Sequence, residues 1–161
     1  MTNVTSVSGR IFLTLKAELS DVPDIEGVTK VVFRLLLAAI LGGVLGYDRE
    51  VKGKAAGFRT HMLVAVGAAF FVLVPLLDGM SSEGISRVLQ GLVAGIGFLG
   101  AGAIIKSDTE SNVQGLTTAA GLWLTAAIGV AVGLGREVTA LLCTGVALLI
   151  LTAMPRFERR E

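Results

Sequence analysis

Polar and charged side chains gather where four apolar stretches of this sequence begin or end. We call this set the polar rim. Its residues are Asp48, Arg49, Glu50, Arg59, Thr60, His61, Gln114, Thr117 and Thr118. A charged group beside an apolar stretch costs free energy unless it is paired or hydrated, so these residues are the first candidates for function.

The polar rim allows more than one chemistry. In the plainest interpretation, Asp48 or Glu50 pairs with Arg59 and the ion pair anchors the helix ends. Alternatively, the rim receives a partner protein, or its two carboxylates hold Mg²⁺ through water, because Mg²⁺ prefers oxygen ligands and keeps several waters. His61 is the only histidine, which favours a hydrogen-bonding role over a transition-metal site. The sequence leaves metal binding open.

Motifs for catalysis are not found in the sequence. It contains no nucleophile with a base and an orienting acid, no phosphate-binding loop with its lysine, and no metalloprotease motif around the single histidine. We therefore expect a protein that is not an enzyme and that needs no cofactor. The one cysteine, Cys143, lies in an apolar stretch, so no disulfide forms within the chain.

The composition is that of a membrane protein. Of the 161 residues, 53% are hydrophobic and 17% are charged, and the mean hydropathy is +0.76. Such a chain is solvated mainly by membrane lipid. The net charge of +1 and the lack of aromatic residues among the basic ones argue against binding to nucleic acid.

Five apolar stretches are long enough to cross a bilayer as helices. They cover residues 28–46, 61–77, 88–105, 116–134 and 138–154. The predicted fold class is an all-α membrane protein, a bundle of about five transmembrane helices with glycine-rich close packing. The predicted domains are an extracytoplasmic segment (1–27), the five-span domain (28–154) and a short basic cytoplasmic tail (155–161).

Two features bear on how the chain meets the membrane. In the first segment, Ile11, Phe12, Leu15 and Leu19 repeat at helical spacing, which predicts either a helix on the membrane surface or a mobile tail. The turn that contains Arg49 and Arg59 is the densest basic cluster, so the positive-inside rule places it and the C-terminus in the cytoplasm and the N-terminus outside.

Small residues are spaced for close helix contacts, because they let backbones approach in lipid. In the third span they are Gly91, Gly95, Gly97, Gly100 and Gly102, and in the fourth Thr117, Gly121, Thr125, Gly129 and Gly133. We expect these two spans to touch backbone to backbone. The run Gly-Ile-Gly-Phe-Leu-Gly-Ala-Gly has more glycine than one contact face uses, so an unwound or mobile segment is an alternative. Arg34, inside the first span, is expected to snorkel to the outer surface, with pairing to an acidic group there as the alternative.

Four motifs in this order resemble the membrane domain of the MgtC/SapB family, over about residues 33–135. They are GYDRE, GFRTHMLVAVGAA, RVLQGLVAGIGFLGAGAIIK and VQGLTTAAGLWLTAAIGVAVG. The resemblance implies a bacterial inner-membrane protein with about five spans and its N-terminus outside. It also implies a role in adapting to low magnesium and, in pathogens, in virulence, through regulation of other membrane machinery.

The resemblance also implies which residues matter. Asp48 and Arg49 match the family's acidic residue and arginine after the first span, and Arg59, Thr60 and His61 match a polar signature. The glycine-rich run matches residues 95–102, and the polar entry to the fourth span matches residues 115–118. Longer members add a soluble cytoplasmic domain, so this chain resembles a short form.

Two functions from different classes follow. The first is a non-enzymatic regulator or adaptor that contacts another membrane protein or a second copy of itself through the polar rim and the small-residue faces. The second is a transporter or channel subunit that uses the glycine-rich run as an interrupted helix near the middle of the membrane.

Overall fold

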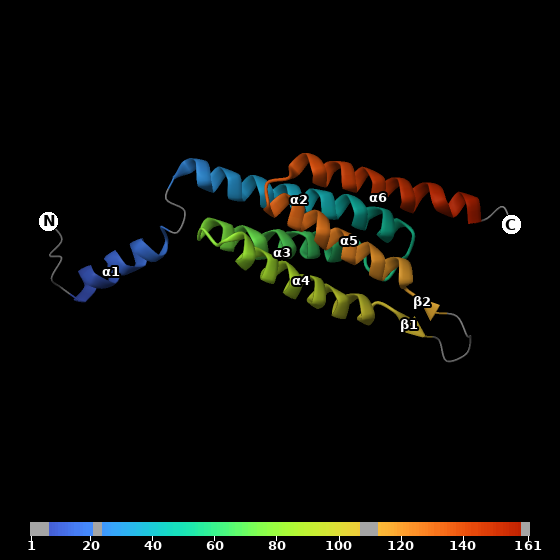
Figure 1. Ribbon diagram of the computed structural model, residues 1–161, viewed down its shortest axis with the longest axis horizontal. Helices are drawn as coiled ribbons and strands as arrows, with labels where there is room; N and C mark the ends of the chain where they lie inside the picture. The colour runs from blue at the N-terminus through green and yellow to red at the C-terminus, as the bar shows by residue number, and fades with distance from the viewer. Residues whose placement is uncertain (1–6, 21–23, 107–112, 159–161) are drawn as a thin grey trace. The chain divides into compact units, whose positions relative to one another are not determined.

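The computed structural model describes residues 7–20, 24–106 and 113–158, and Figure 1 shows its elements. The helices are α1 (Val7–Glu18), α2 (Ile25–Val51), α3 (Phe58–Leu77), α4 (Ser82–Gly102), α5 (Leu116–Gly133) and α6 (Glu137–Glu158), and the strands are β1 (Ile105–Lys106) and β2 (Val113–Gln114). The chain divides into two compact units, residues 1–33 and residues 34–161.

The predicted fold class is confirmed. Helices α2 to α6 correspond in order to the five predicted spans, and α2 to α5 are each long and apolar enough to cross a membrane. The apolar part of α6 that the structure describes, Glu137–Ala153, is shorter. The largest differences in the bounds are at the start of the third span, where α4 begins at Ser82, six residues before the predicted start, and at the end of the first, where α2 continues for five residues, as far as Val51.

The N-terminal unit contains α1 and the beginning of α2. No residue of α1 is buried, and its apolar side chains Ile11, Phe12 and Leu15 are all exposed. Exposed apolar side chains on a helix suit a membrane surface, where they enter the lipid while polar neighbours stay in water. The position of α1 on the membrane surface stays a prediction.

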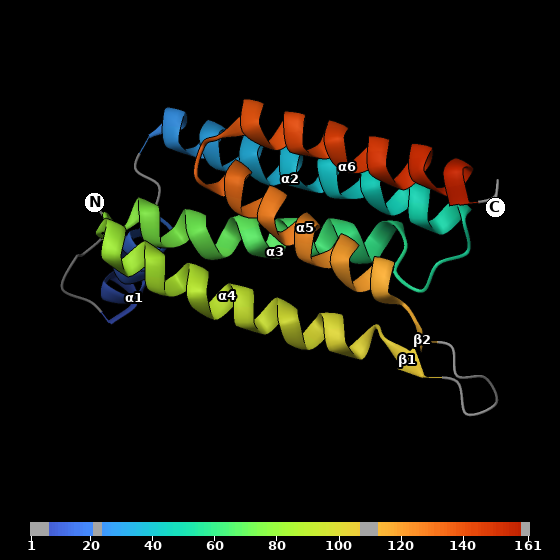
Figure 2. The same cartoon turned by 45° about the vertical axis from the view of Figure 1, so that its right-hand side comes forward.

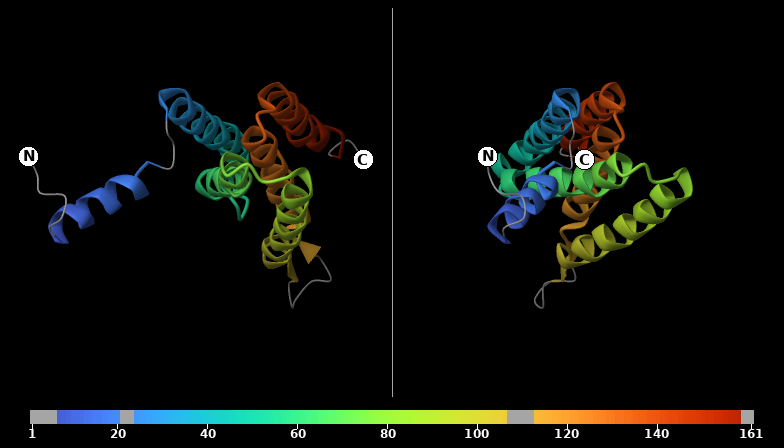
Figure 3. Two further views of the ribbon diagram at one scale, coloured as in Figure 1. Left: turned by 60° about the vertical axis from the view of Figure 1, so that its left-hand side comes forward. Right: turned by 90° about the vertical axis from the view of Figure 1, so that its left-hand side faces the viewer.

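The core of the second unit lies between α2, α3, α5 and α6, which run side by side (Figure 2). It consists mostly of small and branched apolar residues. They are Ala38, Leu41, Leu45, Ala65, Ala69, Ile128, Val132, Ala140 and Ala147. Helix α4 lies on the other side of α3 and α5 from α2 and α6 (Figure 3).

The closest approach of α5 is to α3, and not to α4 as the glycine spacing had predicted. A Cβ at Gly133 would lie 2.6 Å from the Ala69 carbonyl oxygen, and one at Gly129 would overlap the Ala65 carbonyl oxygen. Between α4 and α5 the closest glycine is Gly100, where a Cβ would be in ordinary contact with Ala119 at 3.6 Å. Helix α5 therefore packs closely against α3 through its small residues.

The glycines of α4 mostly face open space. A Cβ at Gly91, Gly95, Gly97 or Gly102 would meet nothing within 4 Å. Helix α4 is continuous from Ser82 to Gly102, so the glycine-rich segment is not unwound, while the alternative of a mobile segment stays a prediction. Ser81 caps this helix by accepting a hydrogen bond from the Gly84 amide, which satisfies one of the free amides of the first turn.

A short antiparallel hairpin joins the end of α4 to the start of α5. Ile105 pairs with Gln114 and Lys106 with Val113. Gly115 follows with a φ of +92°, a conformation that favours glycine, and a Cβ there would overlap the Ala103 carbonyl oxygen. This glycine therefore lets α5 start directly against the end of α4.

Candidate functional site

The last turn of α2 carries a buried arginine. Arg49 is 4% exposed, and its Nη2 donates a hydrogen bond to Oγ1 of Thr118 on α5 at 3.3 Å. Its Nε has no hydrogen-bond partner in the part of the chain that the structure describes. Gly42 and Gly46 let α2 pack against the backbone at the start of α3: a Cβ at Gly46 would lie 2.7 Å from the carbonyl oxygen of Gly57, the residue before α3. This close packing lets Arg49 reach α5.

The first turn of α3 carries a buried histidine. His61 is 1% exposed, and its Nδ1 lies 3.0 Å from the Gly57 carbonyl oxygen, one turn earlier. A carbonyl only accepts hydrogen bonds, so Nδ1 carries a hydrogen and donates it. The other ring nitrogen, Nε2, is buried and has no partner among the described residues.

Both buried side chains reach the same turn of α5. Arg49 bonds to Thr118, which is itself 3% exposed, and a Cβ at Gly121 would lie 3.6 Å from His61 Nε2. Residues three apart on a helix lie on one face. Arg49, His61 and Thr118 thus form one group between α2, α3 and α5, which we call the buried polar cluster.

The carboxylates of the polar rim have other partners. Asp48 forms an ion pair at 2.8 Å with Lys52, one turn later, and Lys52 also donates to the Leu151 carbonyl oxygen of α6 at 2.7 Å. Glu50 Oε2 accepts a hydrogen bond from the Phe58 amide at 2.8 Å and so caps α3. The predicted pairing of Arg59 with Asp48 or Glu50 is therefore wrong.

The remaining rim residues stay outside the buried polar cluster. Arg59, Thr60, Gln114 and Thr117 are all exposed. Their side chains are thus available at the surface, whereas Arg49, His61 and Thr118 are enclosed.

Arg34 forms a separate polar contact near the opposite ends of these helices. Its Nε lies 3.4 Å from Glu137 Oε1 on α6, and its Nη1 donates to the Gly133 carbonyl oxygen of α5 at 3.2 Å. Of the two alternatives for Arg34, the acidic partner is what the structure has, and its snorkelling to the outer surface stays a prediction. The signal was present in the sequence, since Glu137 is the acidic residue that begins α6.

Comparison with known proteins decides the family. The family model described as MgtC family matches residues 35–160, which is most of the chain. This chain belongs to the MgtC family. The sequence resemblance is thereby confirmed, and the match includes all of the buried polar cluster.

Relatives in the MgtC family share up to nearly half of their aligned residues with this chain. Protein SrpB of Synechococcus elongatus is 45% identical over 79% of this chain and 76% of its own length. YhiD of Escherichia coli K12, whose name marks it as a proposed magnesium transporter, is 40% identical over 74% of this chain. Protein MgtC of Salmonella typhimurium is 45% identical over 70% of this chain. No solved structure matches.

The chain is matched to only part of two of these relatives. The aligned region covers 58% of YhiD and 47% of Salmonella MgtC. Family membership and the apolar helices together make this chain a multi-pass membrane protein. What the whole relatives bind or do is not thereby transferred to it.

The chemistry available to this MgtC family member follows from the geometry. Within the described residues, no group of three or more histidine, cysteine, aspartate or glutamate side chains is placed to hold a metal ion. The two carboxylates proposed as Mg²⁺ ligands, Asp48 and Glu50, are engaged by Lys52 and by the start of α3. The buried polar cluster instead offers two nitrogen atoms and a hydroxyl group.

Proposed function

We propose that this protein is a non-enzymatic regulator or adaptor of the bacterial inner membrane, which receives a helix of another membrane protein in a groove between α3 and α4. We further propose that it acts in adaptation to low magnesium, in line with the name of its relative YhiD and the family resemblance. In bacteria that are pathogens, we propose that it also acts in virulence. Its N-terminus is outside and its C-terminus cytoplasmic.

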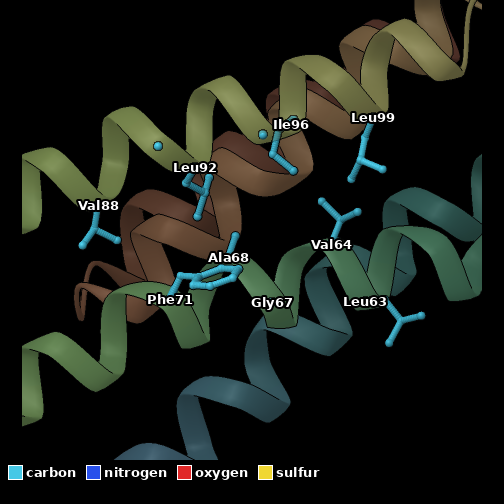
Figure 4. Close-up of a pocket in the computed structure, with 11 residues that line it drawn as sticks. Leu63, Val64, Gly67, Ala68, Phe71, Val88, Leu92, Ile96 and Leu99 are labelled. Atoms are coloured by element: carbon cyan, nitrogen blue, oxygen red, sulfur yellow. The ribbon is translucent and has the colours of Figure 1, made fainter.

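The observation that carries the proposal is the α3–α4 groove, shown in Figure 4. It has a volume of about 610 Å³. Every residue that lines it is apolar: Leu63, Val64, Gly67, Ala68, Phe71, Val88, Gly91, Leu92, Gly95, Ile96 and Leu99. An apolar groove suits an occupant from within the membrane, not a polar solute in transit.

Glycines in the walls favour a helix as the occupant. A Cβ at Gly67, Gly91 or Gly95 would meet nothing within 4 Å, so these positions leave backbone open to a neighbour. In lipid, the hydrophobic effect does not drive helices together. They associate instead through van der Waals contact, which small residues allow to be close. The groove therefore has the surface that a second helix needs.

The proposal is tested by filling the groove. Gly95→Leu places a branched side chain in the groove, and its Cβ would meet nothing within 4 Å, so the protein should remain in the membrane. We expect Gly95→Leu to abolish complementation of a deletion strain at low magnesium and to abolish crosslinking from a photo-reactive residue at Leu99. Gly145→Leu on α6 is the matched control, since a Cβ there also meets nothing within 4 Å. Normal growth and crosslinking with Gly95→Leu would refute the proposal.

The alternative function, a transporter or channel subunit, relied on an interrupted helix in the glycine-rich run. That helix is continuous. Cation flux through purified protein in liposomes is nevertheless the direct test, and reproducible flux of Mg²⁺ or another cation would favour the alternative.

A further inference from the structure

Polar and small residues share one exposed line along α4. We call this line the α4 seam. Its residues are Glu83, Arg87, Gln90, Ala94, Gly97 and Ala101, and all six are exposed. Polar side chains within a membrane span usually face other protein and not lipid. The exposed face of α4 that carries the seam therefore has the character of a protein contact.

The spacing of the seam is that of a helix that pairs with another helix. Its residues follow one another at steps of four, three, four, three and four. Alternating steps of three and four keep a line of side chains facing a partner helix as the two helices wind around each other. Ala94, Gly97 and Ala101 are also small, so they let the two backbones come close. A Cβ at Gly97 would meet nothing within 4 Å.

Gln90 is a polar group that lipid cannot satisfy. It is the ninth residue of α4, and its side-chain amide has no hydrogen-bond partner among the described residues. An amide has two donor hydrogens and an acceptor oxygen, and leaving them unbonded in an apolar surrounding costs free energy. A second glutamine amide supplies both a donor and an acceptor. Gln90 is therefore complementary to Gln90 of another copy of this chain.

The charges at the start of the seam are complementary in the same way. Glu83 and Arg87 lie one turn apart, and neither forms an ion pair with a residue that the structure describes. Two copies inserted in the same direction are related by a two-fold axis along the membrane normal, which brings the same surface of each copy together. Glu83 of each copy then lies beside Arg87 of the other. Two identical seams thus satisfy each other's charges and amides.

We propose that this protein forms a parallel dimer, in which the α4 seam of one copy packs against the α4 seam of a second copy. At about 100° per residue, the centre of the seam lies about 150° around α4 from the centre of the groove-lining positions. Those positions include Val88, Leu92 and Leu99 (Figure 4). The dimer therefore leaves the α3–α4 groove open, and it does not depend on the proposed adaptor function.

Disulfide crosslinking in membranes tests which face of α4 meets the second copy. In a Cys143→Ala background, Ala94→Cys and Ala101→Cys should form disulfide-linked dimers on mild oxidation. Gly95→Cys is the matched control, because Gly95 is also exposed but lines the groove. It should stay monomeric, since a disulfide needs Cα atoms within about 7 Å of each other. Dimers through Gly95→Cys but not through the two seam positions would overturn the proposal.

Energy transfer between labelled copies in liposomes measures the strength of the dimer as lipid dilutes the protein. Gln90→Leu removes the amide at similar size, so the dissociation constant of the dimer should rise by about 3- to 20-fold, the usual effect of one hydrogen bond between membrane helices. Gly97→Leu should abolish the dimer by placing bulk in the seam, while its Cβ meets nothing within the folded chain within 4 Å.

Gly95→Leu separates this proposal from the adaptor function. It fills the groove and should leave the energy transfer unchanged even where it abolishes growth at low magnesium. A wild-type protein without energy transfer at any dilution would overturn the dimer. Energy transfer that is unchanged in both Gln90→Leu and Gly97→Leu would also overturn it, because the seam would then not be the contact.

Discussion

Thr118 supplies the acceptor for the buried Arg49 guanidinium. Thr118→Val keeps the shape of the side chain and removes its oxygen, so Arg49 Nη2 loses a partner that water cannot readily replace. We expect the free energy of unfolding to fall by about 1–3 kcal/mol, the usual cost of a buried polar group left unsatisfied. Titration of the detergent-solubilised protein with a denaturing detergent measures this loss.

The adjacent threonine is a matched control at the same helix end. Thr117 is exposed, whereas Thr118 is 3% exposed. Thr117→Val should change the free energy of unfolding by less than about 0.5 kcal/mol, as is usual at the surface. Equal losses for the two variants would show that the hydrogen bond to Arg49 does not stabilise the fold.

The residues of the buried polar cluster were all in the predicted polar rim, but their pairing was not predictable from type and spacing. The sequence suggested that Arg59 meets Asp48 because both were assigned to the ends of a loop. In the structure α2 continues to Val51, which puts Asp48 and Lys52 one turn apart. An error of five residues in a helix end thus changes which charges meet.

Close packing of α3 against α5 is the main contact between elements that a single substitution can test. Gly129→Ala would drive a methyl group into the Ala65 carbonyl oxygen, and backbone cannot move aside as a flexible side chain does. The two helices must separate, at a cost of about 1–3 kcal/mol or more for overpacking. Denaturing-detergent titration and the yield of folded protein measure the effect.

Gly145→Ala on α6 controls for the exchange of glycine for alanine in a membrane helix. A Cβ at Gly145 meets nothing within 4 Å, so stability should be unchanged or slightly higher. A Gly129→Ala protein as stable as Gly145→Ala would contradict the close approach of α3 and α5.

The sequence predicted the number of helices but not which of them touch. Five apolar stretches of sufficient length leave few alternatives in lipid, where each backbone must satisfy its own hydrogen bonds. Glycine spacing shows that a neighbour can come close, without showing which neighbour. Helices α4 and α5 both carry such glycines, yet Gly129 and Gly133 are used against α3, while Gly91 and Gly95 remain open.

At the scale of the five-helix unit, polar features divide between its two ends. Figure 1 places the α2–α3 loop, the β1–β2 hairpin and the C-terminal end of α6 together at one end. The buried polar cluster lies towards the same end, because it is built from the last turn of α2 and the first turns of α3 and α5. The Arg34–Glu137 contact lies towards the other end.

The basic residues predict which end faces the cytoplasm. Lys52, Lys54 and Arg59 surround the α2–α3 loop, whereas the turn between α3 and α4 contains no lysine or arginine between Leu77 and Ser82. The positive-inside rule therefore places the α2–α3 loop inside the cell. Because α3 is long and apolar enough to cross the membrane, the α3–α4 turn should then be outside.

Single cysteines at the two ends of α3 test this orientation in a Cys143→Ala background. Ala55→Cys and Met80→Cys leave the charge unchanged, and both positions are exposed. A thiol reagent that does not cross membranes should label Met80→Cys in intact cells and Ala55→Cys only in inverted vesicles. The reverse pattern would turn the molecule over and put the buried polar cluster near the outer surface. Labelling of both from one side would mean that α3 does not cross, because a helix that spans the bilayer separates its two ends by the whole hydrocarbon layer.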